Sequence, residues 1–195
     1  MSATLPGPDG HLRCRWCLGS AEYVAYHDTD WGLPVAGGRE LFEKLSLEAF
    51  QSGLSWRTIL DKRTGFRAAF AGFDPARIAE FGAADVARLL TDAGIVRHRG
   101  KIEATITNAR ALLAMGGEAA LAAHVWRHEP APGQGQSTAA ALSKDLKKRG
   151  WAFVGPTTVY AFLQAAGLVN DHAPDCLFHS KALAARAAFT PPGAP

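Results

Sequence analysis

The sequence predicts an all-α protein, and three observations support this fold class. Apolar residues recur at helical spacing along most of the chain; Leu41 and Leu45, for example, share one helix face with Glu48. No stretch alternates apolar and polar residues convincingly, as a half-buried strand would. Capping residues, Gly and Pro separate the periodic segments. We therefore expect about eight helices.

The start and stop signals of these helices can be assigned along the chain. Ser55 can cap a helix that carries apolar residues from 59 to 70, with Gly65 as a candidate break. Gly150 is a typical C-terminal cap, and Pro156 is suited to the first turn of the helix that follows. Periodic apolar residues predict further helices over residues 41–48, 86–93, 102–113 and 139–149.

The chain length suits a single domain. Residues 11–177 are expected to form a single domain of two helical lobes, large enough to contain a catalytic site. Residues 1–10 and 178–195 are expected to be flexible termini, because they are rich in Pro, Gly or small residues. Residues 128–139, with the sequence HEPAPGQGQSTA, are expected to form a loop.

Composition narrows the class of protein. Hydrophobic residues make up 48% of the 195 residues, enough for a substantial core, and charged residues make up 20%. The sequence has no apolar run long enough to cross a membrane, and no basic segment followed by an apolar one opens the chain. Three cysteines do not indicate a disulfide framework. We expect a soluble cytoplasmic protein.

The net charge of +3 is modest, but basic residues cluster in two regions. Such clusters are typical of nucleic-acid binding, and solvated helix faces are the alternative. The first cluster comprises Arg97, His98, Arg99, Lys101 and Arg110. The second comprises Lys144, Lys147, Lys148 and Arg149.

The first cluster coincides with a pair of expected helices over residues 85–110. One helix runs into Gly94, and the next starts after Gly100, so backbone N–H groups at its N-terminus could bind a phosphate. The segment resembles a helix-hairpin-helix DNA-binding element, although Val96 stands where such elements usually carry a second glycine. An ordinary hairpin of two helices remains an alternative. The residues expected to contact the DNA backbone here are Gly94, Arg97, Arg99 and Lys101.

Metal-ligand chemistry is concentrated near both ends of the chain. Cys14 and His27 lie near the N-terminus, and His172 and Cys176 are spaced i, i+4 near the C-terminus. Two Cys and two His suit a tetrahedral zinc ion with no open position, which would be structural. Cys17 complicates this hypothesis, because it forms a C-x2-C pair with Cys14. Either cysteine, or both, could bind, and buried thiols without a metal remain an alternative.

Glu48 lies on an apolar helix face, where a carboxylate is costly unless it is paired or lines a pocket. A Glu at the helix end that turns to solvent is the alternative. One carboxylate among aromatic rings would suit a flat cationic ligand, through stacking and charge neutralisation. Core packing must account for some of these rings. The aromatic residues concentrated in this part of the chain are Trp16, Tyr23, Tyr26, Trp31 and Trp56.

Several long and unusual segments resemble the DNA-3-methyladenine glycosylase I family, in order, over residues 11–176. This resemblance implies a helix-hairpin-helix DNA glycosylase fold in which a zinc ion joins the N- and C-terminal segments. The segments are RCRW, YVAYHDTDWGLP, LFEKLSLEAFQSGLSW, DAGIVRHRGKIEATITNAR and LSKDLKKRGWAFVGPTTVYAFLQAAGLVNDH, followed by Cys176.

The resemblance also assigns residues. It implies that Glu48 hydrogen-bonds a base that has been flipped out of the duplex, and that a loop over residues 51–55 intercalates into the DNA. Within that loop, Gly53 and Leu54 would contact DNA, with Leu54 as the wedge. The implied zinc ligands are Cys14, His27, His172 and Cys176, without Cys17. The implied base-binding residues are Tyr26, Trp56, Trp16 and Tyr23, while the role of Trp31, in the pocket or in the structure around it, stays open.

The implied reaction is hydrolytic excision of 3-methyladenine from alkylated double-stranded DNA, which leaves an abasic site for base excision repair. The methylated base is cationic and leaves readily, so limited general-base assistance is needed. Many related glycosylases use an Asp downstream of the hairpin, but residues 94–143 contain none; Asn108, Glu118 and Glu129 are candidates there in its place. We expect a monomer. A glycosylase for another lesion, or a zinc-containing DNA-binding module without catalysis, are the alternatives.

Overall fold

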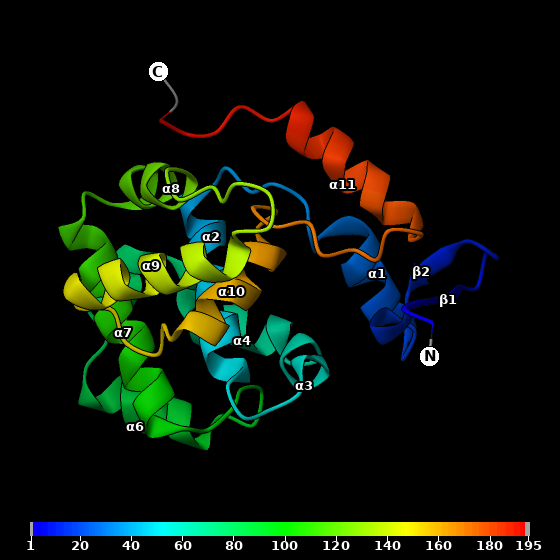
Figure 1. Ribbon diagram of the computed structural model, residues 1–195. Coiled ribbons are helices and arrows are strands. Elements are labelled where there is room, and N and C mark those ends of the chain that lie inside the picture. The colour runs from blue at the N-terminus through cyan, green and yellow to red at the C-terminus, as the bar shows by residue number, and fades with distance from the viewer. Residues whose placement is uncertain (1, 194–195) are drawn as a thin grey trace.

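The computed structural model describes residues 2–193 and is predominantly helical (Figure 1). Its elements in chain order are β1 (Thr4–Pro6), β2 (Leu12–Cys14), η1 (Arg15–Cys17), α1 (Ala21–Thr29), α2 (Gly38–Gln51), α3 (Trp56–Leu60), α4 (Arg63–Ala69), η2 (Ala71–Phe73), α5 (Pro75–Ala79), α6 (Ala83–Thr91), α7 (Arg99–Ala114), α8 (Glu118–Trp126), α9 (Gly135–Lys148), α10 (Pro156–Ala165) and α11 (Leu177–Ala187). Within residues 2–193 there are eleven α-helices, more than the eight or so expected, because several short helices divide the longer predicted segments.

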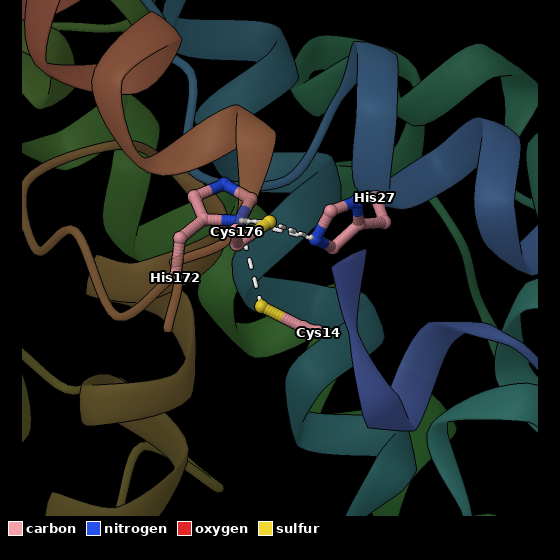
Figure 2. Close-up of side chains that lie close together, drawn as sticks. All are labelled: Cys14, His27, His172 and Cys176. Carbon is pink, nitrogen blue, oxygen red and sulfur yellow. Dashed lines mark hydrogen bonds between the residues drawn. The ribbon is translucent and has the colours of Figure 1, made fainter. Parts of the chain in front are cut away.

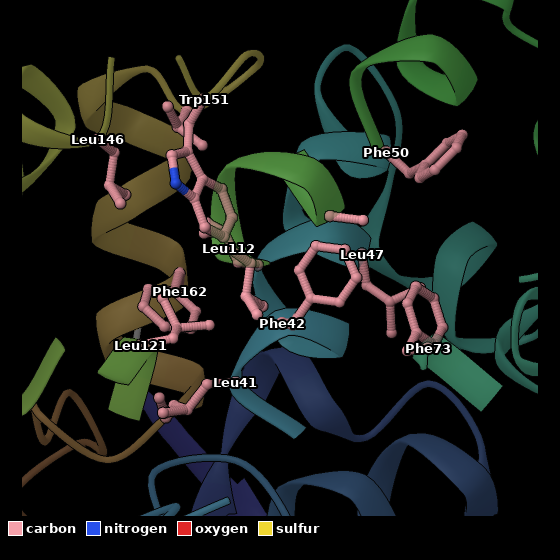
Figure 3. Packing of buried hydrophobic residues seen from close by; sticks show 14 of the residues in the cluster. Leu41, Phe42, Leu47, Phe50, Phe73, Leu112, Leu121, Leu146, Trp151 and Phe162 are labelled. Atoms are coloured by element: carbon pink, nitrogen blue, oxygen red, sulfur yellow. The ribbon is translucent and has the colours of Figure 1, made fainter. Parts of the chain in front are cut away.

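Helix α2 lies at the centre of the molecule and packs against α10, α8, α3 and α7. Nearly all of its residues are buried, including Leu41, Phe42 and Phe50 (Figure 3). The Phe42 ring meets the Trp151 ring edge to face, with 6.1 Å between centroids. At the other end of the helix, the Phe50 ring lies 4.6 Å from that of Phe66. The burial of these large rings fixes the position of the residues at the C-terminal end of α2.

The predicted helix signals act where expected. The Ser55 hydroxyl accepts a hydrogen bond of 3.2 Å from the backbone of Thr58, which caps α3. Gly150 follows α9 with a positive φ of 85°, and the next residue, Trp151, donates back to the carbonyl of Leu146. This pattern is a Schellman motif. Pro156 occupies the first turn of α10, as predicted.

Two predicted boundaries differ from the structure. Gly65 lies inside α4, and the break between α3 and α4 falls at residues 61–62. A Cβ on Gly65 would lie 2.3 Å from the carbonyl oxygen of Gly94, so this glycine permits close packing rather than ending a helix. The predicted loop at 128–139 is also shorter, because α9 begins at Gly135.

Both ends of the described chain have regular structure where flexible termini were expected. Strands β1 and β2 pair antiparallel, with Thr4 opposite Cys14, and the Thr4 hydroxyl donates to Asp175 near the other end of the chain. Helix α11 extends from the region of the strands back towards α8 (Figure 1), where Phe189 packs on Trp126 at 4.6 Å. Tertiary contacts therefore order both segments. Within residues 2–193, no helix is long and apolar enough to span a membrane.

Candidate active site and metal centre

A cavity of about 230 Å³ brings together the predicted acid and the predicted aromatic residues. Sequence reasoning did not identify Ala161 and Gln164, which α10 contributes; no local pattern marks them, because they reach the cavity only through the packing of α10 on α2. Trp31, whose role the sequence left open, also lines the cavity. The lining residues are Trp16, Tyr23, Tyr26, Trp31, Glu48, Gln51, Trp56, Ala161 and Gln164.

Local structure explains why these side chains converge. Tyr23 and Tyr26 are three residues apart in α1 and therefore share a face. The hydroxyl of Ser20 fixes the start of α1 by accepting a hydrogen bond of 3.2 Å from the backbone of Tyr23. Trp56 is the first residue of α3, directly after its cap. Glu48 occupies the last turn of α2, which the core holds in place.

The aromatic residues of the cavity include one partly exposed ring and one buried polar atom without a partner. The Tyr26 and Trp56 rings lie 5.3 Å apart at an angle of 41°. Trp16 packs edge to face on Trp31, with 5.0 Å between centroids, and is 38% exposed. The buried indole N–H of Trp56 has no hydrogen-bond partner in the part of the chain that the structure describes. The cavity thus offers aromatic faces and an unused donor to a ligand.

Glu48 is the one acidic residue in the cavity lining. It is 5% exposed, and burial raises the pKa of its carboxyl to about 8, although the nearby Lys44 acts in the opposite direction. The Lys44 ammonium is itself paired with Asp30. Across residues 2–193 the Glu48 carboxyl forms no hydrogen bond that would stabilise its charge. A cationic ligand or a hydrogen-bond donor in the cavity would supply the missing partner.

The loop between α2 and α3 projects into solvent beside this cavity. Gly53 has a φ of 80° and no neighbour within 4 Å of a Cβ, so the turn requires glycine for its backbone conformation. The following Leu54 is 42% exposed, and its N–H donates to the Gln51 carbonyl at 2.6 Å. An exposed leucine at a tight turn next to a pocket agrees with the predicted wedge, which remains a prediction.

Lys101 does not lie where a phosphate-binding residue should. Its side chain is only 6% exposed, and its ammonium donates to the backbone carbonyls of Phe50 at 2.8 Å and Ser52 at 2.5 Å. These carbonyls end α2, so the ammonium acts as a C-terminal cap. Lys101 therefore joins the start of α7 to the loop that carries Leu54, and its predicted direct contact with DNA is not supported.

The predicted pair of helices is present as α6 and α7, which pack on each other. The amide of Gly94 is already used, since it donates to the Asp92 carboxylate at 2.7 Å. Arg97 and Arg99 are both exposed; Arg99 forms a 3.3 Å ion pair with Glu103 on the next turn. Within the described chain, the backbone amides without an acceptor at this helix start are those of Val96, Arg97, Arg99 and Gly100.

The three acid or amide candidates downstream of the hairpin have structural partners and do not line the cavity. Asn108 is buried and bonds to the backbone of Ala152. Glu118 pairs with Arg39 at 2.9 Å, and Glu129 pairs with Arg186. Glu48 is therefore left as the candidate catalytic acid.

A second cluster of functional side chains ties the two ends of the chain together (Figure 2). Cys14, His27, His172 and Cys176 are buried, and one ligand atom from each lies within 4.8 Å of the others. The His27 Nε2 and His172 Nδ1 atoms are 3.1 Å apart. The Cys176 sulfur lies 3.5 Å from the former and 3.8 Å from the latter. The Cys14 sulfur is also 3.8 Å from His172 Nδ1.

These distances fit a tetrahedral metal ion. A metal about 2.3 Å from sulfur and about 2.0 Å from nitrogen places S and N roughly 3.5 Å apart. The other ring nitrogen of His27 is paired with the Asp28 carboxylate at 2.7 Å, which orients the ring as in many metal sites. Arg13 in turn pairs with Asp28 at 2.9 Å. Cys17 is buried but lies outside the cluster, which favours Cys14 over the C-x2-C pair.

The fold and the site together define a helical protein with a cavity in which aromatic faces surround one buried acid, an arrangement that suits a flat, electron-poor ring. This chain is similar to a specific family of such proteins. A methyladenine glycosylase family profile matches residues 16–180. The chain belongs to the methyladenine glycosylase family.

Relatives and solved structures agree with this family. The chain is 49% identical to DNA-3-methyladenine glycosylase 1 of Escherichia coli (strain K12), over 84% of this chain and 95% of that protein. A crystal structure of 3-methyladenine DNA glycosylase I superposes with a TM-score of 0.77 at 46% identity, over 85% of this chain and 98% of the other. A structure of the Staphylococcus aureus enzyme, determined to explain 3-methyladenine recognition, gives 0.75 at 35% identity, over 85% and 95%.

Proposed function

We propose that this protein is a DNA repair enzyme that excises 3-methyladenine from alkylated DNA by hydrolysing the N-glycosidic bond. The observation that carries this proposal is the cavity in which a buried, unpaired carboxyl faces the rings of Tyr26 and Trp56. The family relationship supports it, because relatives 43–49% identical over 84% of this chain are 3-methyladenine glycosylases.

The cavity suits the methylated base in the form in which it is joined to deoxyribose. That base is flat and carries a positive charge, so it can stack on the aromatic faces and attract an ionised Glu48. A cation in the cavity stabilises the ionised carboxylate and lowers its pKa from about 8. An unmethylated adenine has no such charge and gains less from the site.

Access to the base requires that it leave the duplex. Leu54 is placed to fill the gap in the base stack, while the start of α7 holds the DNA backbone through its free amides and exposed arginines. Flipping costs a few kcal/mol and costs least for a damaged base that pairs poorly. Because α2 ends between Glu48 and Leu54, one short segment carries both the residue that opens the duplex and the residue that receives the base.

Bond cleavage then needs little proton transfer from the protein. The N-glycosidic bond breaks with its electron pair going to the cationic base, which departs as a neutral molecule. A water adds to C1′ and loses a proton to solvent or to the Glu48 carboxylate, which leaves an abasic site. Glu48 is the one carboxyl in the lining, and it could accept a hydrogen bond from this water or from the departing base. No lysine is among the lining residues, which favours hydrolysis by water over a Schiff-base mechanism.

The metal centre is proposed to hold zinc in a structural role. Two thiolates and two imidazoles form a closed tetrahedral set that leaves no position for water or substrate. None of the four residues lines the cavity. The bound metal would supply rigidity, joining β2 and α1 to the segment before α11.

The remaining proposals concern DNA binding, oligomeric state and localisation. We propose that α6 and α7 act as a helix-hairpin-helix element on double-stranded DNA. We also propose that the enzyme is a cytoplasmic monomer, since one chain supplies the whole site.

The test is chromatography of bases released from methylated duplex DNA by wild type, Glu48→Gln and Glu48→Ala. We expect wild type to release 3-methyladenine, and both variants to lose at least tenfold in rate because the buried charge is absent. Equal release by the variants would remove Glu48 from the mechanism. Folded wild type that binds the duplex but releases no base would support a DNA-binding module, and release of a different base would support a glycosylase for another lesion.

A further inference from the structure

The loop that joins α9 to α10 is fixed on both sides of one exposed aromatic ring. Before the ring, the buried side chain of Asn108 accepts from the N–H of Ala152 at 2.7 Å and donates to its carbonyl at 3.0 Å. After the ring, the carbonyl of Val154 accepts 2.6 Å from the Ser143 hydroxyl. Figure 1 shows this connection passing α7, from which Asn108 comes. The residue between these attachments, Phe153, has little freedom to move.

Phe153 is held in a conformation that its own chemistry does not favour. Its φ is 55°, in the left-handed region that a bulky non-glycine residue seldom adopts. Its side chain is nevertheless 40% exposed, so the fold gains no full burial of the ring in return. Strained backbone at a rigidly held position is often associated with function. The ring is therefore a candidate contact for a ligand of the whole protein.

The residues around the Phe153 ring indicate which class of ligand the ring would contact. Phe153 lies 6.2 Å from the ring of His98, the residue that caps α7, and its tip is 3.6 Å from the position of a Cβ on Gly100. It thus borders the helix start whose amides are free. The next residue of that turn, Lys101, reaches Ser52 in the loop that carries Leu54. Two exposed apolar side chains, Leu54 and Phe153, are thereby connected through one helix end.

Three lysine side chains on α9 add positive charge to the candidate ligand surface around Phe153. The exposed Lys144, Lys147 and Lys148 on α9 line a hollow of about 510 Å³ together with Pro156, which starts α10. None of the three forms an ion pair within residues 2–193, whereas Arg149 beside them is paired with Asp145 at 2.8 Å. Ser143 also lines this hollow, and its hydroxyl donates to the carbonyl of Val154, the residue after Phe153. The hollow with its three unpaired ammonium groups therefore adjoins the loop that carries the exposed ring, and the two together suit a polyanion with apolar sugars and bases, which is a nucleic-acid strand.

We propose that Phe153 is a second apolar contact with the substrate duplex, and that Lys144, Lys147 and Lys148 bind phosphates next to it. The ring packs on a deoxyribose or base beside the phosphates that the start of α7 holds. This inference rests on the proposed function for its choice of DNA. The rigid loop means that the contact is available before binding, so no ordering of the loop opposes it.

The test measures dissociation constants for a duplex with an abasic site analogue, and KM for methylated duplex. The central variant is Phe153→Asn, because Asn tolerates a positive φ and so removes the ring without adding strain. We expect its duplex Kd and KM to rise about tenfold, while its affinity for free 3-methyladenine stays unchanged. Phe153→Tyr, which keeps the ring, should behave like wild type. Leu113→Ala is the matched control, since Leu113 is 41% exposed on the C-terminal half of α7.

A second measurement addresses the lysines. Replacing all three lysines with alanine should reduce the magnitude of the slope of log K against log salt concentration by about two to three, if each binds one phosphate. An unchanged duplex Kd in Phe153→Asn, or an unchanged salt slope in the triple variant, would overturn the corresponding part of the inference. The Kd comparison stands even if wild type released no 3-methyladenine; that result would count against the proposed function alone.

Discussion

Two buried glutamates of α2 show how the surroundings of a residue decide its role. Glu43 accepts from Arg63 at 2.7 Å and is also paired with Arg67 at 2.8 Å, so its charge is neutralised within the protein. Glu48, five residues later, has no such partner and faces a cavity. A paired buried acid serves the fold, whereas an unpaired one imposes a cost that a ligand can remove. This contrast, rather than burial itself, identifies Glu48 as the functional acid.

The raised pKa of Glu48 has a consequence for stability. The ordinary pKa of a glutamate is 4.5, and in the folded protein that of Glu48 is about 8, so between these values the folded state holds a proton that the unfolded state has lost. The free energy of unfolding should therefore decrease as pH rises from about 5 to about 8, by up to ~1.4 kcal/mol per pH unit. Denaturant unfolding of wild type and Glu48→Gln across this range measures the effect.

The difference between the two proteins isolates the one group, because every other titration is common to both. We expect Glu48→Gln to gain stability relative to wild type with increasing pH, by a few kcal/mol at pH 8. Addition of free 3-methyladenine should reduce this difference if the ligand binds the ionised form of wild type. A difference that does not change with pH would mean that the carboxyl titrates normally and is not desolvated.

At the scale of helices and strands, the sequence predicts what local chemistry determines and fails where distant contacts decide. Ser55, Gly150 and Pro156 act through neighbouring backbone groups, so their roles as caps and helix starts were predictable. Lys101 looked like a DNA contact because its sequence neighbours are basic, yet its ammonium reaches the end of α2, 49 and 51 residues away. No periodicity or spacing contains that information.

The residues of the candidate site also divide into those that local chemistry marks in the sequence and those that only distant contacts place. The acid, the aromatic residues and the four metal-ligand candidates were assigned because their chemistry is unusual and their segments resemble a known family. Gln164 was missed, since a glutamine on a helix carries no local signal for a pocket formed between helices. The strand pair near the N-terminus was missed because each strand has only three residues and depends on contacts with the C-terminal segment.

Helix α4 and the turn between α6 and α7 provide a test at this scale. A Cβ on Gly65 would lie 2.3 Å from the Gly94 carbonyl, which is too close for any side chain. Gly65→Ala should push the turn away from α4, lower the free energy of unfolding by about 1–3 kcal/mol and weaken duplex binding. Chemical denaturation and fluorescence anisotropy with labelled DNA measure the two effects.

Gly82→Ala is the control for this prediction. Gly82 precedes α6 with a negative φ, and a Cβ there meets nothing within 4 Å, so alanine should change neither stability nor binding by much. If Gly65→Ala binds duplex as well as wild type and is destabilised, the turn does not take part in DNA binding. If Gly65→Ala and Gly82→Ala are equally stable, the close approach of α4 to the turn at Gly94 does not contribute to the free energy of unfolding.

At the scale of the whole molecule, two sets of contacts attach the terminal segments within residues 2–193 to the rest of the protein. The cluster of Cys14, His27, His172 and Cys176 joins β2 and α1 to the segment before α11. The far end of α11 is attached through Phe189 on Trp126 and through the ion pair of Arg186 with Glu129. Because α1 also supplies Tyr23 and Tyr26 to the cavity, the geometry of the base site depends on the first attachment.

Removal of the proposed zinc ion should therefore loosen the aromatic side of the cavity before it unfolds the core. We expect chelation of the purified protein, or the substitution Cys176→Ser, to lower Tm by several degrees and to weaken binding of free 3-methyladenine. Quantification of bound zinc by atomic absorption, with thermal unfolding and calorimetric titration of the base, measures the three quantities. The packing around Phe42 and Phe50 lies on α2 and should persist, so far-UV circular dichroism should keep most of its helical signal.

Cys17→Ala is the matched variant for this experiment. Cys17 is as buried as Cys176 but lies outside the cluster, so its substitution should leave the zinc content at one per chain and lower Tm only by the cost of a small cavity. Loss of zinc from Cys17→Ala with retention in Cys176→Ser would reverse the assignment and restore the C-x2-C pair. Unchanged base affinity in a fully metal-free protein would show that β2 and α1 are held by their ion pairs, such as Arg13 with Asp28, and that the cluster stabilises the termini without shaping the base site.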